Sequence, residues 1–158
     1  MRITKTHIII VFVAVIGAYC LFYTLRDMLS SEENKIKRIF SSIAEEVESR
    51  AVFGATKYLS TDFRLEHDFS GFESISYATV KRMLLVFYKN FESPIVKIES
   101  ISVELKGDNM ALVEFAGYLA DKKQPGRAYY SGNATLKKID NEWLITNAKI
   151  MKRELQQK

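Results

Sequence analysis

The N-terminal part of the chain is apolar and uncharged over a length that matches one bilayer. No Lys, Arg, Asp or Glu lies between Thr6 and Leu25, and residues 8–16 read IIIVFVAVI. A helix of about 20 residues rises about 30 Å, which is the thickness of the hydrocarbon core of a membrane. We therefore predict a transmembrane helix over Ile8–Leu25, within an N-terminal segment of residues 1–29 that comprises a cytoplasmic tail and this anchor.

Two alternatives for this stretch stay open. Arg2 and Lys5 followed by the apolar run also fit the start of a secretory signal peptide, although the bulky residues that follow disfavour cleavage. Cys20 would allow lipid attachment, although Tyr19 stands where a small residue is expected.

Basic residues before the span favour a cytoplasmic N-terminus. The expected location is the inner cell membrane of a bacterium, with one span and the C-terminal domain outside the cytoplasm.

The composition argues against several kinds of site. The chain has 158 residues and a net charge of +4, and basic and acidic residues nearly balance after the apolar stretch. Nucleic-acid binders usually carry a strongly basic face, so the sequence predicts no nucleic-acid partner. One cysteine and two histidines are too few for a clustered metal or haem site. Without a Gly-rich phosphate loop or a nucleophile elbow, the sequence predicts no cofactor and no metal.

Residues 30–158 are expected to form one folded domain that begins with helices. Ser30 and Ser31 precede Glu32 and Glu33, which is a typical helix start. Apolar residues then recur at helical spacing up to Val47. The pattern predicts two further helices, over Ala51–Leu59 and from Ser74 or Ser76 to about Lys89, with Ser60–Asp62 ending the second helix and a short strand at Phe63–His67.

The second half of the domain has strand patterns separated by tight turns. Four strands are predicted, over Val96–Lys106, Met110–Ala120, Arg127–Ile139 and Trp143–Met151. The apolar residues of the first change phase near Glu99–Ser100, which predicts a β-bulge. Helices followed by a meander indicate an α+β fold, with three helices packed on the concave face of a curved, largely antiparallel sheet. The predicted core comprises Ile36, Ile39, Phe40, Ile43, Val47, Leu84, Phe87, Val113, Phe115, Leu136 and Trp143.

Three segments in this order resemble the nuclear-transport-factor-2-like superfamily, which has a cone-shaped fold. They read YLSTDF (58–63), KGDNMALV (106–113) and LKKIDNEWLI (136–145), and the resemblance covers Glu32–Arg153. The chain also resembles a bacterial subgroup of this superfamily that carries a membrane or lipid anchor and has no settled activity. The resemblance implies an apolar pocket inside the cone, in which the enzymes of this fold place acid–base residues from the early helices and the concave sheet face.

Few residues of the chain are candidates for catalysis. His67 lies near three acids in the sequence, and Glu114 shares an alternation with Met110 and Leu112, on a face that either meets the helices or faces solvent. A buried Glu114 would have a raised pKa and could act as a base. Four further residues are candidates for ligand contacts in the pocket: Tyr118, Tyr129, Asn133 and Asn147.

The functional expectation is a membrane-tethered, non-catalytic binding or interaction module, including an accessory subunit of a membrane complex. A homodimer or a protein partner is expected on the outer sheet face, because apolar residues such as Leu112 and Tyr118 alternate with the predicted core residues Val113 and Phe115. The alternative is a small-molecule-binding protein, or a lyase- or isomerase-like enzyme, that uses the cone pocket.

Overall fold

The computed structural model of the protein describes residues 31–67 and 74–153. The chain divides into two compact units, residues 1–35 and 36–158, and the domain lies in the second. The expected span at Ile8–Leu25 lies outside the described residues. No helix within the described part has the length and apolar character needed to cross a membrane.

Three helices are present among the described residues, as the sequence predicted. They are α2 (Glu32–Glu48), α3 (Val52–Thr56) and α4 (Tyr77–Asn90). The Ser31 hydroxyl accepts a hydrogen bond from the main-chain N–H of Asn34 (3.2 Å), which is the expected capping geometry at the start of α2. The prediction for α3 was too long. Tyr58 already pairs with the sheet through its carbonyl, which accepts a hydrogen bond from the N–H of Ile145 (2.8 Å), so the helix cannot continue to Leu59.

The sheet has six strands in the order β2-β1-β6-β5-β4-β3. β1 and β6 run parallel, and every other neighbouring pair is antiparallel. Ser60–Asp62, predicted to end the second helix, lie instead inside β1. The strands are β1 (Leu59–His67), β2 (Ile75–Ser76), β3 (Pro94–Leu105), β4 (Met110–Asp121), β5 (Gln124–Ile139) and β6 (Glu142–Arg153).

The predicted bulge in β3 is confirmed. Ile98 pairs with Gly117 and Ser100 pairs with Ala116, so Glu99 is the extra residue. A bulge locally strengthens the twist of a strand. On either side of it, Ile98 and Ile101 both pack against the core. The bulge therefore keeps both apolar stretches of β3 on the same face of the sheet.

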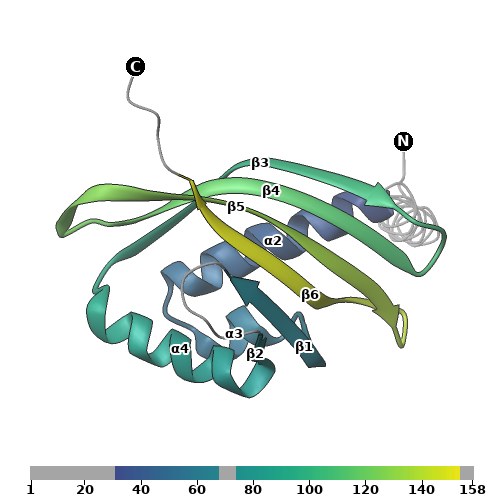
Figure 1. Ribbon diagram of the computed structural model, residues 1–158, viewed down its shortest axis with the longest axis horizontal. Coiled ribbons are helices and arrows are strands. Elements are labelled where there is room, and N and C mark those ends of the chain that lie inside the picture. The colour runs from purple at the N-terminus through teal and green to yellow at the C-terminus, as the bar shows by residue number, and fades with distance from the viewer. Residues whose placement is uncertain (1–30, 68–73, 154–158) are drawn as a thin grey trace, which may run out of the picture. The chain divides into compact units, whose positions relative to one another are not determined.

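The core lies between the helices and one face of the sheet. Figure 1 shows α2, α3 and α4 together on one side of the curved strands β3–β6. The predicted core residues Ile36, Phe40, Val113, Leu136 and Trp143 are buried. Ile39, Ile43 and Phe115 are partly buried against them. Val47, Leu84 and Phe87 are half-buried, and the first two of these face a cavity.

Candidate functional site

A cavity of about 350 Å³ lies between the helices and the concave face of the sheet. α2 contributes Phe40 and Val47 to its wall, and α4 contributes Val80 and Leu84. Small-molecule sites in proteins commonly have volumes of roughly 300–1,000 Å³. The remaining wall is formed by α3, β1 and the four long strands, through Ala55, Thr56, Leu59, Phe63, Leu65, Val96, Lys97, Ile98, Phe115 to Leu119, Tyr130, Ala134, Ile145, Ala148 and Ile150, together with Ile43 and Ala44 of α2.

The wall of this cavity is almost entirely apolar. The polar residues among the described ones that form it are Thr56, Lys97, Tyr118 and Tyr130, and none is Asp, Glu or His. Lys97 and Tyr118 pair with each other, and the Tyr118 ring contacts Tyr129, so the side chains of Lys97 and Tyr118 point away from the cavity. The Thr56 hydroxyl is already used, because it donates to the main-chain carbonyl of Val52 (2.9 Å). The described wall therefore offers no carboxylate or imidazole to act as a general base.

The predicted ligand residues Tyr118 and Tyr129 lie directly opposite each other on β4 and β5. Their ring centroids are 5.7 Å apart, and the guanidinium of Arg127 lies 4.6 Å from the Tyr118 ring centroid. A hydrogen bond to Tyr129 and the nearby phenol of Tyr118 raise the pKa of Arg127. Tyr118 is among the residues that line the cavity and Tyr129 is not, but the Tyr118 ring lies on the outer face of the sheet, with Tyr129. The structure therefore brings two of the four predicted ligand residues together, with a cation stacked on one of them.

Glu114 and the two predicted asparagines lie on the other face of the sheet from the core. Glu114 is exposed and pairs with the exposed Asn133, while its neighbours Ala111 and Val113 are buried. The face of Glu114 is thus the one that meets solvent. A register shift in β6 sets Ile145 opposite Leu136 and Asn147 opposite Thr135. Neither asparagine belongs to the cavity wall.

His67 is the last residue of β1 and lies opposite Ile150, which belongs to the cavity wall. Its side chain, and residues 68–73 that follow it, lie outside the described part of the chain. Within that described part, no group of three His, Cys, Asp or Glu residues is arranged to hold a metal ion.

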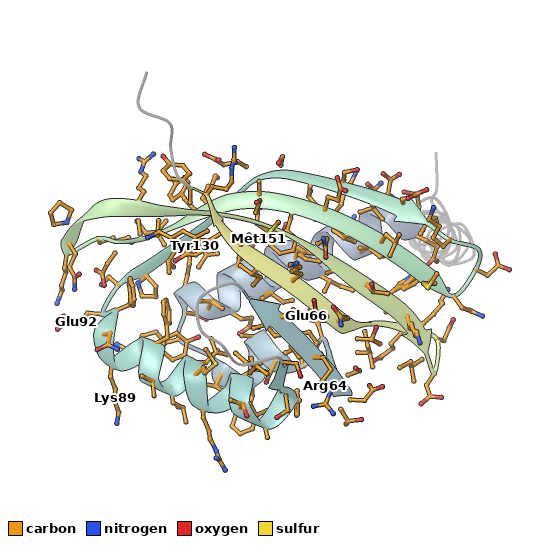
Figure 2. All side chains as sticks on the ribbon, in the orientation of Figure 1. Arg64, Glu66, Lys89, Glu92, Tyr130 and Met151 are labelled. Atoms are coloured by element: carbon orange, nitrogen blue, oxygen red, sulfur yellow. The ribbon has the colours of Figure 1, made fainter. Side chains whose placement is uncertain are left out.

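The cavity wall also contains Tyr130, which the sequence offers as a phenolic donor beside Tyr118 and Tyr129, and Lys97, which sequence reasoning missed. Tyr130, labelled in Figure 2, follows Tyr129 and therefore points to the opposite face of β5. The alternation of Tyr130 with the buried Ala134 and Leu136 was a usable signal for its inward face. Lys97 alternates with Val96 and Ile98 of the wall, so its side chain points to the outer face of the sheet.

Comparison with known proteins identifies the fold. No protein-family model and no curated protein sequence matches the chain. An NTF2-like protein of unknown function from Pseudomonas putida KT2440 aligns over 78% of this chain and 89% of its own, with 8% identity and a TM-score of 0.69. A candidate scytalone dehydratase from Novosphingobium aromaticivorans aligns over 83% and 87%, with 13% identity and a TM-score of 0.65.

A third similar structure has a different kind of description. A candidate association domain of a calcium/calmodulin dependent protein kinase II from Xanthomonas campestris aligns over 80% of this chain and 92% of its own, with 17% identity and a TM-score of 0.65. The domain therefore has the nuclear-transport-factor-2-like fold. At such low identity the likeness describes the fold alone.

Proposed function

We propose that the domain binds a small apolar molecule in its cavity without transforming it, as a membrane-tethered binding module. The observation that carries this proposal is the chemistry of the cavity wall. Phe40, Phe63, Leu84 and Ile150 are typical of it, and its described part has no carboxylate or imidazole. A site with this wall favours ligands that bury hydrocarbon surface.

The cavity is large enough for an apolar ligand to bind with useful affinity. Burying roughly 250 Å² of apolar ligand surface is worth about 6 kcal/mol at 25 cal/mol per Å². The loss of translational and rotational freedom offsets part of this gain. Tyr130 would orient one polar end of the ligand, because it places a phenol on the inward face of β5.

The alternative is a lyase- or isomerase-like reaction in the same cavity. It would need a general base, and the described wall provides neither an acid nor a histidine for that role. Of the two predicted catalytic residues, His67 is the candidate for this role, since it lies opposite Ile150 of the wall, whereas Glu114 lies on the outer face. Catalysis is therefore distinguished from simple binding by whether the protein converts the bound ligand into a different molecule.

The ligand proposal is tested on the full chain purified from membranes in mild detergent. Leu84→Trp should fill the cavity, because Leu84 belongs to its wall, and Leu112→Trp is the matched control on the exposed sheet face. Organic extraction followed by mass spectrometry should recover an apolar molecule from the wild-type protein and from the control, but not from the Leu84 variant. Equal recovery from all three proteins would contradict the proposal.

The same experiment separates binding from catalysis. The extracted molecule is incubated with fresh protein and analysed again by chromatography and mass spectrometry. We expect an unchanged mass and an unchanged retention time. A new product that depends on wild-type protein would favour the lyase- or isomerase-like alternative.

A protein partner on the outer sheet face is the second candidate function. Met110 and Leu112 of β4 are exposed there, and Glu114 lies on the same face. A homodimer or an accessory role in a membrane complex would cover these side chains. Sedimentation of the full chain in detergent, with Leu112→Lys as the variant, tests this: the variant should shift an oligomer to monomer, and a wild-type monomer with no partner recovered from membranes would contradict it.

A further inference from the structure

The outward face of α4 carries apolar side chains between two cations. Arg82, Leu85, Val86 and Lys89 follow one another at helical spacing, and we call these four residues the α4 face. Leu85 is 55% exposed and Val86 is 56% exposed. Residues at positions i, i+3, i+4 and i+7 share one side of a helix. The exposed apolar pair therefore has a cation one turn before it and another one turn after it.

The opposite side of the same helix already faces the cavity, through Val80 and Leu84. A helix that covers one core normally exposes polar residues on its other side. α4 instead exposes Leu85 and Val86, and a third apolar side chain, Met83, is 47% exposed. The apolar residues of the α4 face are thus not explained by the packing of the domain.

The charges within α4 have one sign. α4 contains Lys81, Arg82 and Lys89 and no Asp or Glu, and α3 contains no charged residue. No ion pair of Arg82 or Lys89 occurs among the described residues.

Two acids of the described part, Glu46 of α2 and Glu92 shortly after α4, have lysine partners. Glu46 pairs with Lys57 (3.7 Å), and Glu92 pairs with Lys123. Figure 2 shows Glu92 and Lys89 close to the C-terminal end of α4. The positive charge of Arg82 and Lys89 is therefore available to a partner.

A largely exposed aromatic residue extends the apolar surface of the helical layer. Phe53 of α3 is 81% exposed, and the ammonium group of Lys81 lies 5.3 Å from its ring centroid. The same ammonium group lies 4.5 Å from the Tyr77 ring. An exposed aromatic ring beside cations is a common feature of segments that lie in the interface of a bilayer.

We propose that the α4 face docks on the surface of a bilayer that contains anionic lipids. Leu85 and Val86 enter the boundary between headgroups and acyl chains, and Arg82 and Lys89 contact the lipid phosphates. Charge complementarity favours this occupant, because a basic and apolar helix face without acids matches an anionic, partly apolar surface. The proposal rests on the outward side of α4 and does not depend on a ligand in the cavity.

The test uses the full chain in vesicles, in a Cys20→Ser background. An environment-sensitive fluorophore is attached through Val86→Cys or, as the matched control, through Leu112→Cys on the outer sheet face. Both proteins have the same N-terminal segment, so its interaction with the membrane contributes equally. In vesicles rich in phosphatidylglycerol, position 86 should show a blue-shifted emission that brominated lipids quench, and position 112 should not.

Two further measurements identify the lipid and the charge. Vesicles of phosphatidylcholine alone, or high salt, should reduce the quenching at position 86. Arg82→Glu combined with Lys89→Glu should lower the ratio of docked to undocked protein by roughly tenfold or more in the anionic vesicles. Circular dichroism checks that the double variant is folded. If it is not folded, the salt series on the protein without the two charge reversals replaces this measurement.

Several outcomes would overturn the proposal. Equal quenching at positions 86 and 112 would show that the bilayer contacts the α4 face no more than it contacts the outer sheet face. An emission at position 86 that is as blue-shifted in detergent as in anionic vesicles would indicate a protein contact or a second copy of the chain. Quenching that is insensitive to lipid charge, salt and charge reversal would also contradict it.

Discussion

The guanidinium group of Arg50 donates a hydrogen bond to the main-chain carbonyl of Tyr88 and lies 5.6 Å from the centroid of the Tyr88 ring. It also reaches the carbonyl of Glu92 at 3.5 Å. Arg50 therefore joins the chain that leaves α2 to the last turn of α4. A cation at the C-terminal end of a helix is favourable, because it meets carbonyl groups that have no partner in the helix.

Removing this side chain should weaken the helical layer. Arg50 has a φ of 63°, in the left-handed region where glycine is most readily accommodated. Arg50→Ala should lower the free energy of unfolding by about 1–2 kcal/mol, because a partly exposed charged hydrogen bond is lost. Arg50→Gly should cost less, because it relaxes the backbone while losing the same contact. Chemical denaturation of the full chain in detergent, followed by circular dichroism, measures both, and a larger cost for glycine would contradict this account.

A large-to-small change at Phe40 tests the core beside the cavity. Phe40 is 8% exposed, and its ring lies 5.5 Å from that of Phe115. Phe40→Ala should lower the free energy of unfolding by about 3–5 kcal/mol, since the transfer free energy of the ring is lost and the cavity is enlarged. The exposed Phe53 is the matched control, and Phe53→Ala should change stability by less than about 0.5 kcal/mol. A loss below about 1 kcal/mol at Phe40 would show that the α2 face is misassigned.

Much of the fold follows from the periodicity of the sequence. The spacing of Ile36, Phe40 and Ile43 predicts the buried face of α2, and the phase change in β3 predicts the bulge at Glu99. The start of β1 was missed because Leu59 extends the apolar pattern of α3 and the polar residues Ser60–Asp62 are typical of a helix end. That strand is defined by its parallel pairing with β6, which lies far away in the sequence, and local pattern carries no information on such a partner.

The candidate site was less predictable than the fold. Phe40, Val47 and Leu84 have the pattern of filled core positions, and a periodic pattern does not distinguish a filled core from a hollow one. Tyr118 and Tyr129 were predicted as ligand residues, but their contact depends on the register between β4 and β5. Register is set by tight turns and by which face is covered, and only the second of these can be estimated from alternation.

The close approach of β3 and β4 at Gly117 gives a third prediction. A Cβ atom at this position would lie 2.0 Å from the main-chain carbonyl oxygen of Lys97. Gly117→Ala should therefore force the two strands apart beside the bulge and lower the free energy of unfolding by about 1–3 kcal/mol. Ala116→Ser, at the neighbouring residue, is the matched control and should have a much smaller effect. The thermal unfolding temperatures of the two variants test this prediction. Equal unfolding temperatures would mean that the strands move apart without a cost in stability.

The last prediction concerns the Asp121 carboxylate, which connects the turn after β4 to the segment before β3. Its oxygens accept hydrogen bonds from the main-chain N–H groups of Lys123 (2.8 Å) and Ser93 (3.4 Å), and the residue is 6% exposed. The hydrogen bond from Lys123, followed by that from Ser93, holds the pKa of Asp121 below its ordinary value of 3.8.

Because the pKa is lower in the folded state than in the unfolded state, the ionised carboxylate stabilises the fold above pH 3.8. This stabilisation is lost as the pH falls through the folded pKa. Asp121→Asn should therefore be less stable than the wild type at neutral pH, and the difference should shrink in acid. Asp108→Asn, in an exposed turn, is the matched control and should follow the wild-type pH profile. Unfolding measured across an acid-to-neutral series tests this, and a difference between Asp121→Asn and the wild type that stays constant down to the lowest pH would rule out the carboxylate as its source.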